Sequence, residues 1–199
     1  MMMKHRDDTG AKIGMWLFLF TELLLFGGLF LLYAVYRYIH QEEFHHAAAE
    51  LNLVMGTANT LILLTSSLTM VLSISSIERG NKKSSILCLV LTILLGAAFL
   101  INKYFEWSAK IHHGIFPDSP DLLTRSHGEI LFYGLYFVMT GLHGLHVLIG
   151  IVVLSVMLVL VIRGRIGPSR FVALENSGLY WHLVDIIWIY LFPLFYLIT

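Results

Sequence analysis

The residues from Phe132 to Gly150 read FYGLYFVMTGLHGLHVLIG, inside an apolar run that continues without proline from His127 to Ile162. A helix needs roughly 20 residues to cross a bilayer. This longer run therefore predicts a membrane helix that tilts or extends beyond the bilayer on one side. We expect the other apolar segments of the chain to pack around it.

The composition agrees with a membrane protein. Of the 199 residues, 57% are hydrophobic and 13% are charged, and the mean hydropathy is +0.77. Thirteen basic and thirteen acidic residues cancel, so no excess charge points to nucleic acid as a partner. Cys88 is the only cysteine, which excludes an internal disulfide and any site that needs two thiols.

Five apolar segments are long enough to span a membrane, and segments of this length predict helices rather than barrel strands. We predict an all-α integral membrane protein, a single domain that forms a bundle of five transmembrane helices. Polar or proline-containing connections separate the spans, which we place at residues 13–36, 51–77, 84–107, 127–162 and 176–198.

The basic residues give an orientation. With five spans the two termini lie on opposite sides of the membrane, and the side of the N-terminus carries nine lysines and arginines against four on the other. The positive-inside rule therefore predicts a cytoplasmic N-terminus and a C-terminus outside. The nine are Lys4, Arg6, Lys12, Arg79, Lys82, Lys83, Arg163, Arg165 and Arg170.

His143 and His146 are three residues apart, so they share one side of the long helix, and we expect them to face protein. Gly141 and Gly144 remove side-chain bulk beside them and predict the close approach of a neighbouring helix. Imidazole is a common metal ligand. A closed metal site needs more ligands than this pair and His182 supply, so we predict no metal site here.

Glu22 lies near the middle of the first span. A carboxylate in hydrocarbon must be protonated, paired or placed in a wet cleft. A proton- or lipid-linked role and a hydrogen-bonded clasp between helices are both open.

Glu175 lies directly before the last span, and His182 and Asp185 lie within it; Glu175 is seven residues before His182, two turns earlier on nearly the same face. We expect His182 and Asp185 to pair, each satisfying the other in low dielectric. A buried structural polar network is favoured over direct chemistry for this group.

Three further polar positions lie near span ends or inside spans: Asn59, Lys103 and Glu106. We expect Lys103 and Glu106 to form a local ion pair, with the lysine reaching toward the membrane surface. Tryptophans and tyrosines near the predicted span ends indicate an interfacial belt: Trp16, Trp107, Trp181, Tyr104, Tyr180 and Tyr196.

Taken together, these motifs resemble subunit III of the haem-copper terminal oxidases, the cytochrome c oxidase subunit III family, in a short five-helix form. The resemblance lies in GMWLFLFTELLLFGGLF around Glu22, NTLILLTSS from Asn59 and KYFE from Lys103. It continues in FYGLYFVMTGLHGLHVLIG from Phe132 and ENSGLYWHLVDIIWIYLF from Glu175.

The resemblance implies a non-catalytic subunit of a bacterial-type aerobic terminal oxidase in the inner membrane. The complex reduces oxygen to water and pumps protons, while haem and copper reside in the partner catalytic subunit I. The chain would support proton uptake and the stability of that subunit, associate with the other oxidase subunits and bind phospholipid. Glu22 falls on the family's intramembrane acid. The residues that fall on the family's other shared polar positions are His143, His146, Glu175, His182 and Asp185.

Two alternatives stay open. Related short proteins accompany quinol oxidases and nitric oxide reductases, and nothing in the sequence identifies the electron donor. An independent small transporter is the alternative of another class. Transporters usually show inverted repeats and helices broken at the midplane. Here Pro193 is the only proline inside a span, and five spans do not divide into two equal repeats.

Overall fold

The computed structural model describes residues 8–197, and all of its regular elements are helices. Five of them are long and apolar enough to cross a membrane, as predicted. These are α1 (Asp8–Ile39), α3 (Leu53–Glu78), α4 (Lys82–His112), α6 (His127–Ile162) and the segment Val172–Leu197, which comprises α7 (Val172–Phe192) and the π-helical η1 (Pro193–Leu197). Ile198, the predicted end of the last span, and Lys4 and Arg6 lie outside the described residues.

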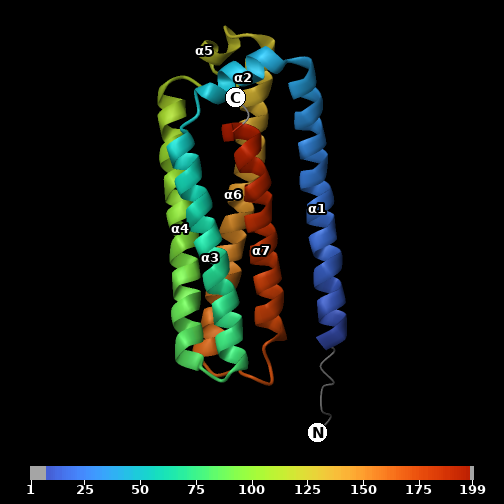
Figure 1. Ribbon diagram of the computed structural model, residues 1–199, viewed down its shortest axis with the longest axis vertical. Helices are drawn as coiled ribbons and strands as arrows, with labels where there is room; N and C mark the ends of the chain where they lie inside the picture. Colours follow the sequence, from blue (N-terminus) through green and yellow to red (C-terminus); the bar gives the residue numbers. More distant parts are fainter. Residues whose placement is uncertain (1–7, 198–199) are drawn as a thin grey trace.

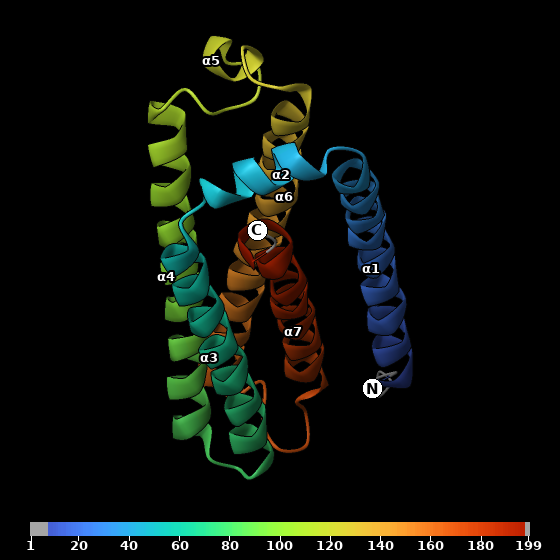
Figure 2. The same ribbon diagram turned by 45° about the horizontal axis from the view of Figure 1, so that its top comes forward.

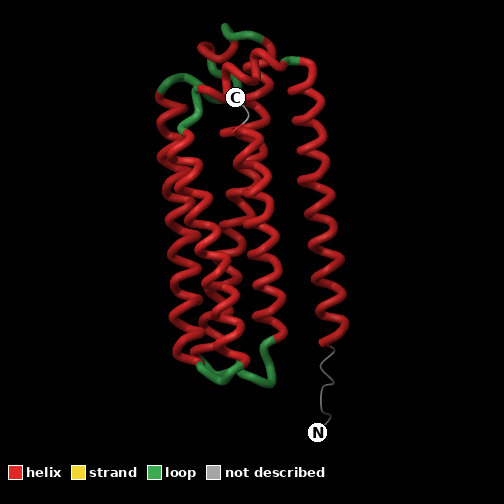
Figure 3. Tube along the Cα trace, in the orientation of Figure 1, coloured by secondary structure: helices red, strands yellow, loops and turns green. Residues whose placement is uncertain are grey.

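The long helices run side by side, and the connecting segments lie at the two ends of the bundle (Figure 3). α3, α4, α6 and α7 form a four-helix group, while α1 stands to one side of it and packs on α6 and α7 (Figures 1 and 2). The N-terminal end of α1 and the last described helix, η1, lie at opposite ends of the bundle (Figure 1). We call the end with the α3–α4 and α6–α7 turns the basic end, and the other the cap end.

Helix boundaries follow local capping chemistry. Asn52, counted in the second span, precedes α3 as its N-cap, and its side chain accepts a hydrogen bond from Met55 N at 3.1 Å. α3 ends at Glu78 and is terminated by Gly80 (φ 78°), after which Asn81 N bonds the carbonyl of Ser76; glycine is favoured at this left-handed position. The same arrangement at Gly114 carries α4 to His112, beyond the Trp107 expected from apolarity alone.

The cap end holds two short helices, in segments predicted only as connections between spans. α2 (Gln41–Ala49) lies across the end of the bundle and buries Phe44, Ala47 and Ala48 against it (Figure 2). α5 (Pro120–Leu123) begins with proline at its first turn, a position where the missing N–H costs nothing.

Two tryptophans of α7, Trp181 and Trp188, are buried in the core of the bundle. Trp181 lies between Gly96 of α4 and Gly150 of α6, where an added Cβ would come within 2.6 and 2.8 Å of its ring. Its Nε1 donates to Ser66 Oγ at 3.0 Å. The interfacial position expected for Trp181 is therefore wrong, because two glycines make space for the ring inside the bundle.

Candidate functional site

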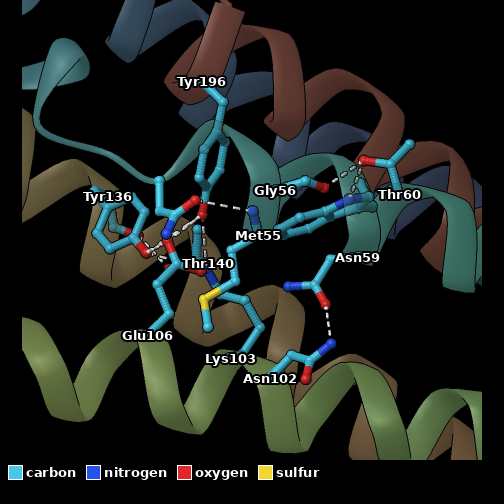
Figure 4. Close-up of polar contacts among 12 residues, drawn as sticks. Met55, Gly56, Asn59, Thr60, Asn102, Lys103, Glu106, Tyr136, Thr140 and Tyr196 are labelled. Atoms are coloured by element: carbon cyan, nitrogen blue, oxygen red, sulfur yellow. Dashed lines mark hydrogen bonds and ion pairs between the residues drawn. The ribbon is translucent and has the colours of Figure 1, made fainter.

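A buried polar cluster lies near the cap end, made by Lys103 and Glu106 of α4, Tyr136 of α6 and Tyr196 of η1 (Figure 4). Lys103 Nζ lies 3.0 Å from Glu106 Oε2, so the predicted ion pair is confirmed. Lys103 is only 7% exposed and Glu106 only 5%. The expected reach of the lysine toward the surface is wrong, because two tyrosine hydroxyls meet it inside the protein.

The cluster uses all of its polar hydrogens. An ammonium has three donors, and those of Lys103 go to Glu106, Tyr136 Oη (3.0 Å) and Tyr196 Oη (3.1 Å). Each hydroxyl in turn donates to Glu106 Oε1, at 2.7 Å from Tyr136 and 2.5 Å from Tyr196. The charges of Lys103 and Glu106 cancel, and adding or removing a proton would leave a net charge in the interior. The cluster therefore stays in one protonation state and links α4, α6 and η1 as a structural brace.

Two further hydrogen bonds lie beside this cluster (Figure 4). Asn102 Nδ2 donates to Asn59 Oδ1 at 3.0 Å and joins α4 to α3. Trp188 Nε1 donates to Thr60 Oγ1 at 3.0 Å and joins α7 to α3. Asn59 is fully buried. Its side chain therefore lies in a contact between helices and not on a lipid-facing surface.

Glu22 pairs with His146 across the space between α1 and α6, with Oε2 3.0 Å from Nε2. His146 Nδ1 lies 2.7 Å from the carbonyl of Leu142, which can only accept, so Nδ1 carries a hydrogen. One more proton then lies between Nε2 and the carboxyl. It forms either a neutral acid–imidazole pair or an ionised pair in the same geometry.

His143 faces a different neighbour. It is fully buried against the rings of Phe99 and Trp188, at centroid distances of 5.5 and 5.3 Å. Neither ring nitrogen has a hydrogen-bond partner among the described residues. Within residues 8–197, no three His, Cys, Asp or Glu side chains converge as a metal site would require. Of the two flanking glycines, Gly141 meets the Trp107 ring closely, whereas Gly144 has only Leu100 at 4.0 Å.

The polar residues of α7 do not pair with one another. Glu175 binds Lys12 of α1 at 3.0 Å, and His182 Nδ1 lies 2.7 Å from Ser67 Oγ of α3. The predicted bond between His182 and Asp185 is wrong. His182 instead turns to α3, where the Ser67 hydroxyl meets its Nδ1, so its partner comes from a neighbouring helix and not from the next turn of α7.

The predicted polar residues therefore face protein but do not form one network. The structure joins Glu22 to His146, Glu175 to Lys12 and His182 to Ser67. Asp185 is 3% exposed, and neither of its carboxyl oxygens has a partner at hydrogen-bond geometry among the described residues.

A second ion pair at the cap end was not predicted. Arg125 Nη1 donates to both carboxyl oxygens of Glu50, at 2.9 and 3.0 Å, and Tyr133 Oη donates to the same carboxylate at 2.6 Å. Partial burial raises the pKa of Glu50, but these hydrogen bonds outweigh it, so the pKa lies below its ordinary value. The hydrogen bond with Glu50 raises the pKa of Arg125.

Sequence reasoning missed Tyr133, Tyr136 and Tyr196 as well as Glu50 and Arg125. The tyrosines lie in apolar runs with the general character of core or belt residues. Their partners are 30 or more residues away along the chain, so periodicity carries no signal for them. The lysine–glutamate spacing in α4 was the one local sign of the buried cluster.

The fold and these sites define a class: a multi-pass membrane protein of long packed helices whose buried acids, imidazoles and lysine brace the bundle. The profile of one family, cytochrome c oxidase subunit III, matches residues 4–199. The chain belongs to the cytochrome c oxidase subunit III family and is a subunit III of the haem-copper oxidases.

Relatives named for two kinds of oxidase are similar to it. Cytochrome c oxidase subunit 3 of Thermostichus vulcanus is 34% identical over 98% of this chain and 90% of the relative. Quinol oxidase subunit 3 of Bacillus subtilis (strain 168) is 32% identical over 98% and 91%. A haem-copper oxidase subunit I+III of Aeropyrum pernix is 30% identical over 94% of this chain and 22% of the relative. Membership of an oxidase complex sets aside the independent transporter.

Proposed function

We propose that this subunit III is a non-catalytic partner of subunit I that supports proton uptake and the stability of the catalytic subunit. In this proposal the haem and copper that reduce oxygen belong to subunit I, and this chain binds neither. Association with subunit I follows from the family, and in the Aeropyrum pernix relative both names belong to one chain.

The Glu22–His146 pair carries the proposal. Its Nε2–Oε2 separation of 3.0 Å lets one proton lie on either atom without a rearrangement of the helices. A groove of about 400 Å³ between α1, α6 and α7 opens beside the pair, with Met15, Phe18 and Tyr180 among its walls. The groove gives the pair access to the surroundings, which a buried clasp would not need.

The proposed orientation has the basic end in the cytoplasm of a bacterial cell and the chain in the inner membrane. The positive-inside rule supports it, since Lys82 and Lys83 begin α4 at that end and Arg163 and Arg165 lie in the turn after α6. The bacterial relatives support the location.

We also assign the groove beside Glu22 to a phospholipid acyl chain. Its walls are mostly apolar and it opens to the side of the bundle, where lipid is the surrounding solvent. Mass spectrometry of lipids retained by the purified complex tests this. Replacement of Val153, which lines the groove, by Trp should reduce the retained lipid.

The electron donor is either cytochrome c or a quinol, since relatives of both names match at similar identity. Co-purification with the partner subunits, followed by a haem spectrum and assays with each donor, distinguishes the two. Isolation of the chain without any haem-bearing neighbour would contradict the proposed function.

Glu22→Gln tests the role of the pair. The amide keeps the shape and one hydrogen bond to His146 but cannot release a proton, so we expect an assembled complex whose sustained turnover falls. Asn102→Ala is the matched control, since it removes a buried helix contact that carries no titratable group. Loss of the whole complex in Glu22→Gln would make Glu22 a structural clasp instead.

A further inference from the structure

A second groove lies on the other side of the α1–α7 contact. It has a volume of about 300 Å³, lies between α1, α3 and α7, and runs from Lys12 and Glu175 to His182. The Lys12 and Glu175 side chains at its mouth are 49% and 31% exposed, so the entrance is polar and open. A water occupies about 30 Å³ in the liquid, so the groove has room for several.

His182 connects this groove to the interior. Its Nδ1 lies 2.7 Å from Ser67 Oγ on α3. The same serine hydroxyl lies near the carboxyl of Asp185, one turn further along α7, without forming a hydrogen bond with it. The order of groups from the groove inward is therefore imidazole, hydroxyl and carboxyl. In a Ser-His-Asp hydrolase the imidazole lies between the other two, so this arrangement is not a nucleophilic triad.

Asp185 is the unusual member of this set. The residue is only 3% exposed near the middle of the last span, and no lysine, arginine or histidine pairs with its carboxyl within residues 8–197. An ionised carboxylate without a partner is very costly there, so a proton on the carboxyl stabilises the site. A purely structural acid would be expected to have fixed hydrogen-bond partners.

We propose that Asp185 is a proton-exchange site of this subunit, reached from the basic end through the groove, His182 and Ser67. A proton from water binds His182 Nε2. The Nδ1 proton then moves to Ser67 Oγ while the Ser67 hydroxyl proton moves to the Asp185 carboxylate. His182 is left neutral with its proton on Nε2. The reverse transfers complete the exchange: the Asp185 carboxyl proton moves to Ser67 Oγ, the Ser67 hydroxyl proton returns to Nδ1, and the Nε2 proton leaves to water, which restores the starting tautomer.

This site is distinct from the Glu22–His146 pair, which opens into the groove between α1, α6 and α7. The exchange site would serve the role in proton uptake proposed above, and its physiological purpose rests on that proposed function. The experiments below need no turnover. Their failure therefore leaves the proposed function intact, and failure of co-purification or of the Glu22→Gln assay leaves the exchange site intact.

Infrared spectroscopy of the purified complex tests the relay. In the wild type we expect a protonated carboxyl band that shifts in D₂O and disappears in Asp185→Asn. In Ser67→Ala the shift should be at least about tenfold slower, as expected when a proton-transfer group is removed. Ser155→Ala is the matched control, because that hydroxyl bonds only its own helix, at Ile151 O. Absence of the band, or equal rates in Ser67→Ala and Ser155→Ala, would overturn the proposal.

Thiol labelling tests the groove independently. In a Cys88→Ala background, Leu179→Cys places a thiol on the groove wall, and Ile186→Cys places one on the 50% exposed lipid side of the same helix. A membrane-impermeant maleimide reacts with thiolate in water. We expect labelling of Leu179→Cys only, and only when the basic end is accessible in vesicles. An unreactive Leu179→Cys would show a dry groove and overturn the route.

Discussion

Lys103 illustrates at the residue scale how a charge is tolerated inside this bundle. The ammonium is accepted because one carboxylate and two hydroxyl oxygens take its three hydrogens, and the same hydroxyls satisfy the carboxylate. The sequence shows the lysine and the glutamate, and their spacing gives the ion pair. It does not show that Tyr136 and Tyr196 lie beside this pair. It therefore predicts an ion pair near the membrane surface, whereas the pair lies in the core.

The first stability prediction concerns this cluster. Lys103→Met leaves Glu106 as a buried unpaired carboxylate, so we expect a loss of about 3–5 kcal/mol in the free energy of unfolding. The double variant Lys103→Met, Glu106→Gln removes both charges and should recover a large part of that loss. Denaturation in detergent, analysed as a double-mutant cycle, measures the difference. Lys83→Met, at an exposed position of the basic end, is the control. Equal losses in the single and double variants would contradict the electrostatic explanation.

At the element scale, small residues decide how closely the helices approach. Gly96 and Gly150 accept the Trp181 ring, and Gly178 of α7 faces Ile74 of α3 within 2.6 Å of an added Cβ. In α1, by contrast, Gly14, Gly27 and Gly28 have nothing within 4 Å of the corresponding position. The same residue type therefore has two structural meanings, and only the packing separates them.

Gly96→Ala and Gly27→Ala test this difference. The first forces the Trp181 ring to move, and overpacking of this kind costs about 1–3 kcal/mol. The second meets open space and removes the low helix propensity of glycine, so we expect no loss of stability. Thermal unfolding of the two variants in the same detergent compares them. Similar midpoints would show that the Trp181 site adjusts freely.

At the scale of the whole molecule, four helices form the core and α1 is held beside them at three heights. The contacts are Lys12–Glu175 at the basic end, Glu22–His146 at mid-length and the Tyr33 hydroxyl to the Leu194 carbonyl at the cap end. The cap end is closed by α2 and by the segment before α6, which the Glu50–Arg125 pair joins.

This closure predicts a pH dependence. Because the pKa of Glu50 is lower in the folded protein, its contribution to stability is fully present above the unfolded value of about 4.3 and is lost as pH falls through the folded value. Glu50→Gln should therefore unfold at a lower temperature than the wild type at neutral pH, and the difference should vanish in acid. Unfolding midpoints from neutral pH down to acid measure this. A difference that persists at the lowest pH would mean that the amide disturbs packing rather than charge.

The sequence by itself determined five membrane helices, their order and the family, because a span needs only a local run of apolar residues and the motifs are contiguous. It also determined that Glu22, His143, His146 and Asp185 face protein, since hydrocarbon penalises each of them locally. Only the tertiary structure decided their partners: Glu22 pairs with His146, His182 bonds Ser67, and Asp185 has no hydrogen-bond partner among the described residues. Hydrogen-bond partners depend on helix rotation and on neighbours far away in the chain, which local hydropathy does not encode.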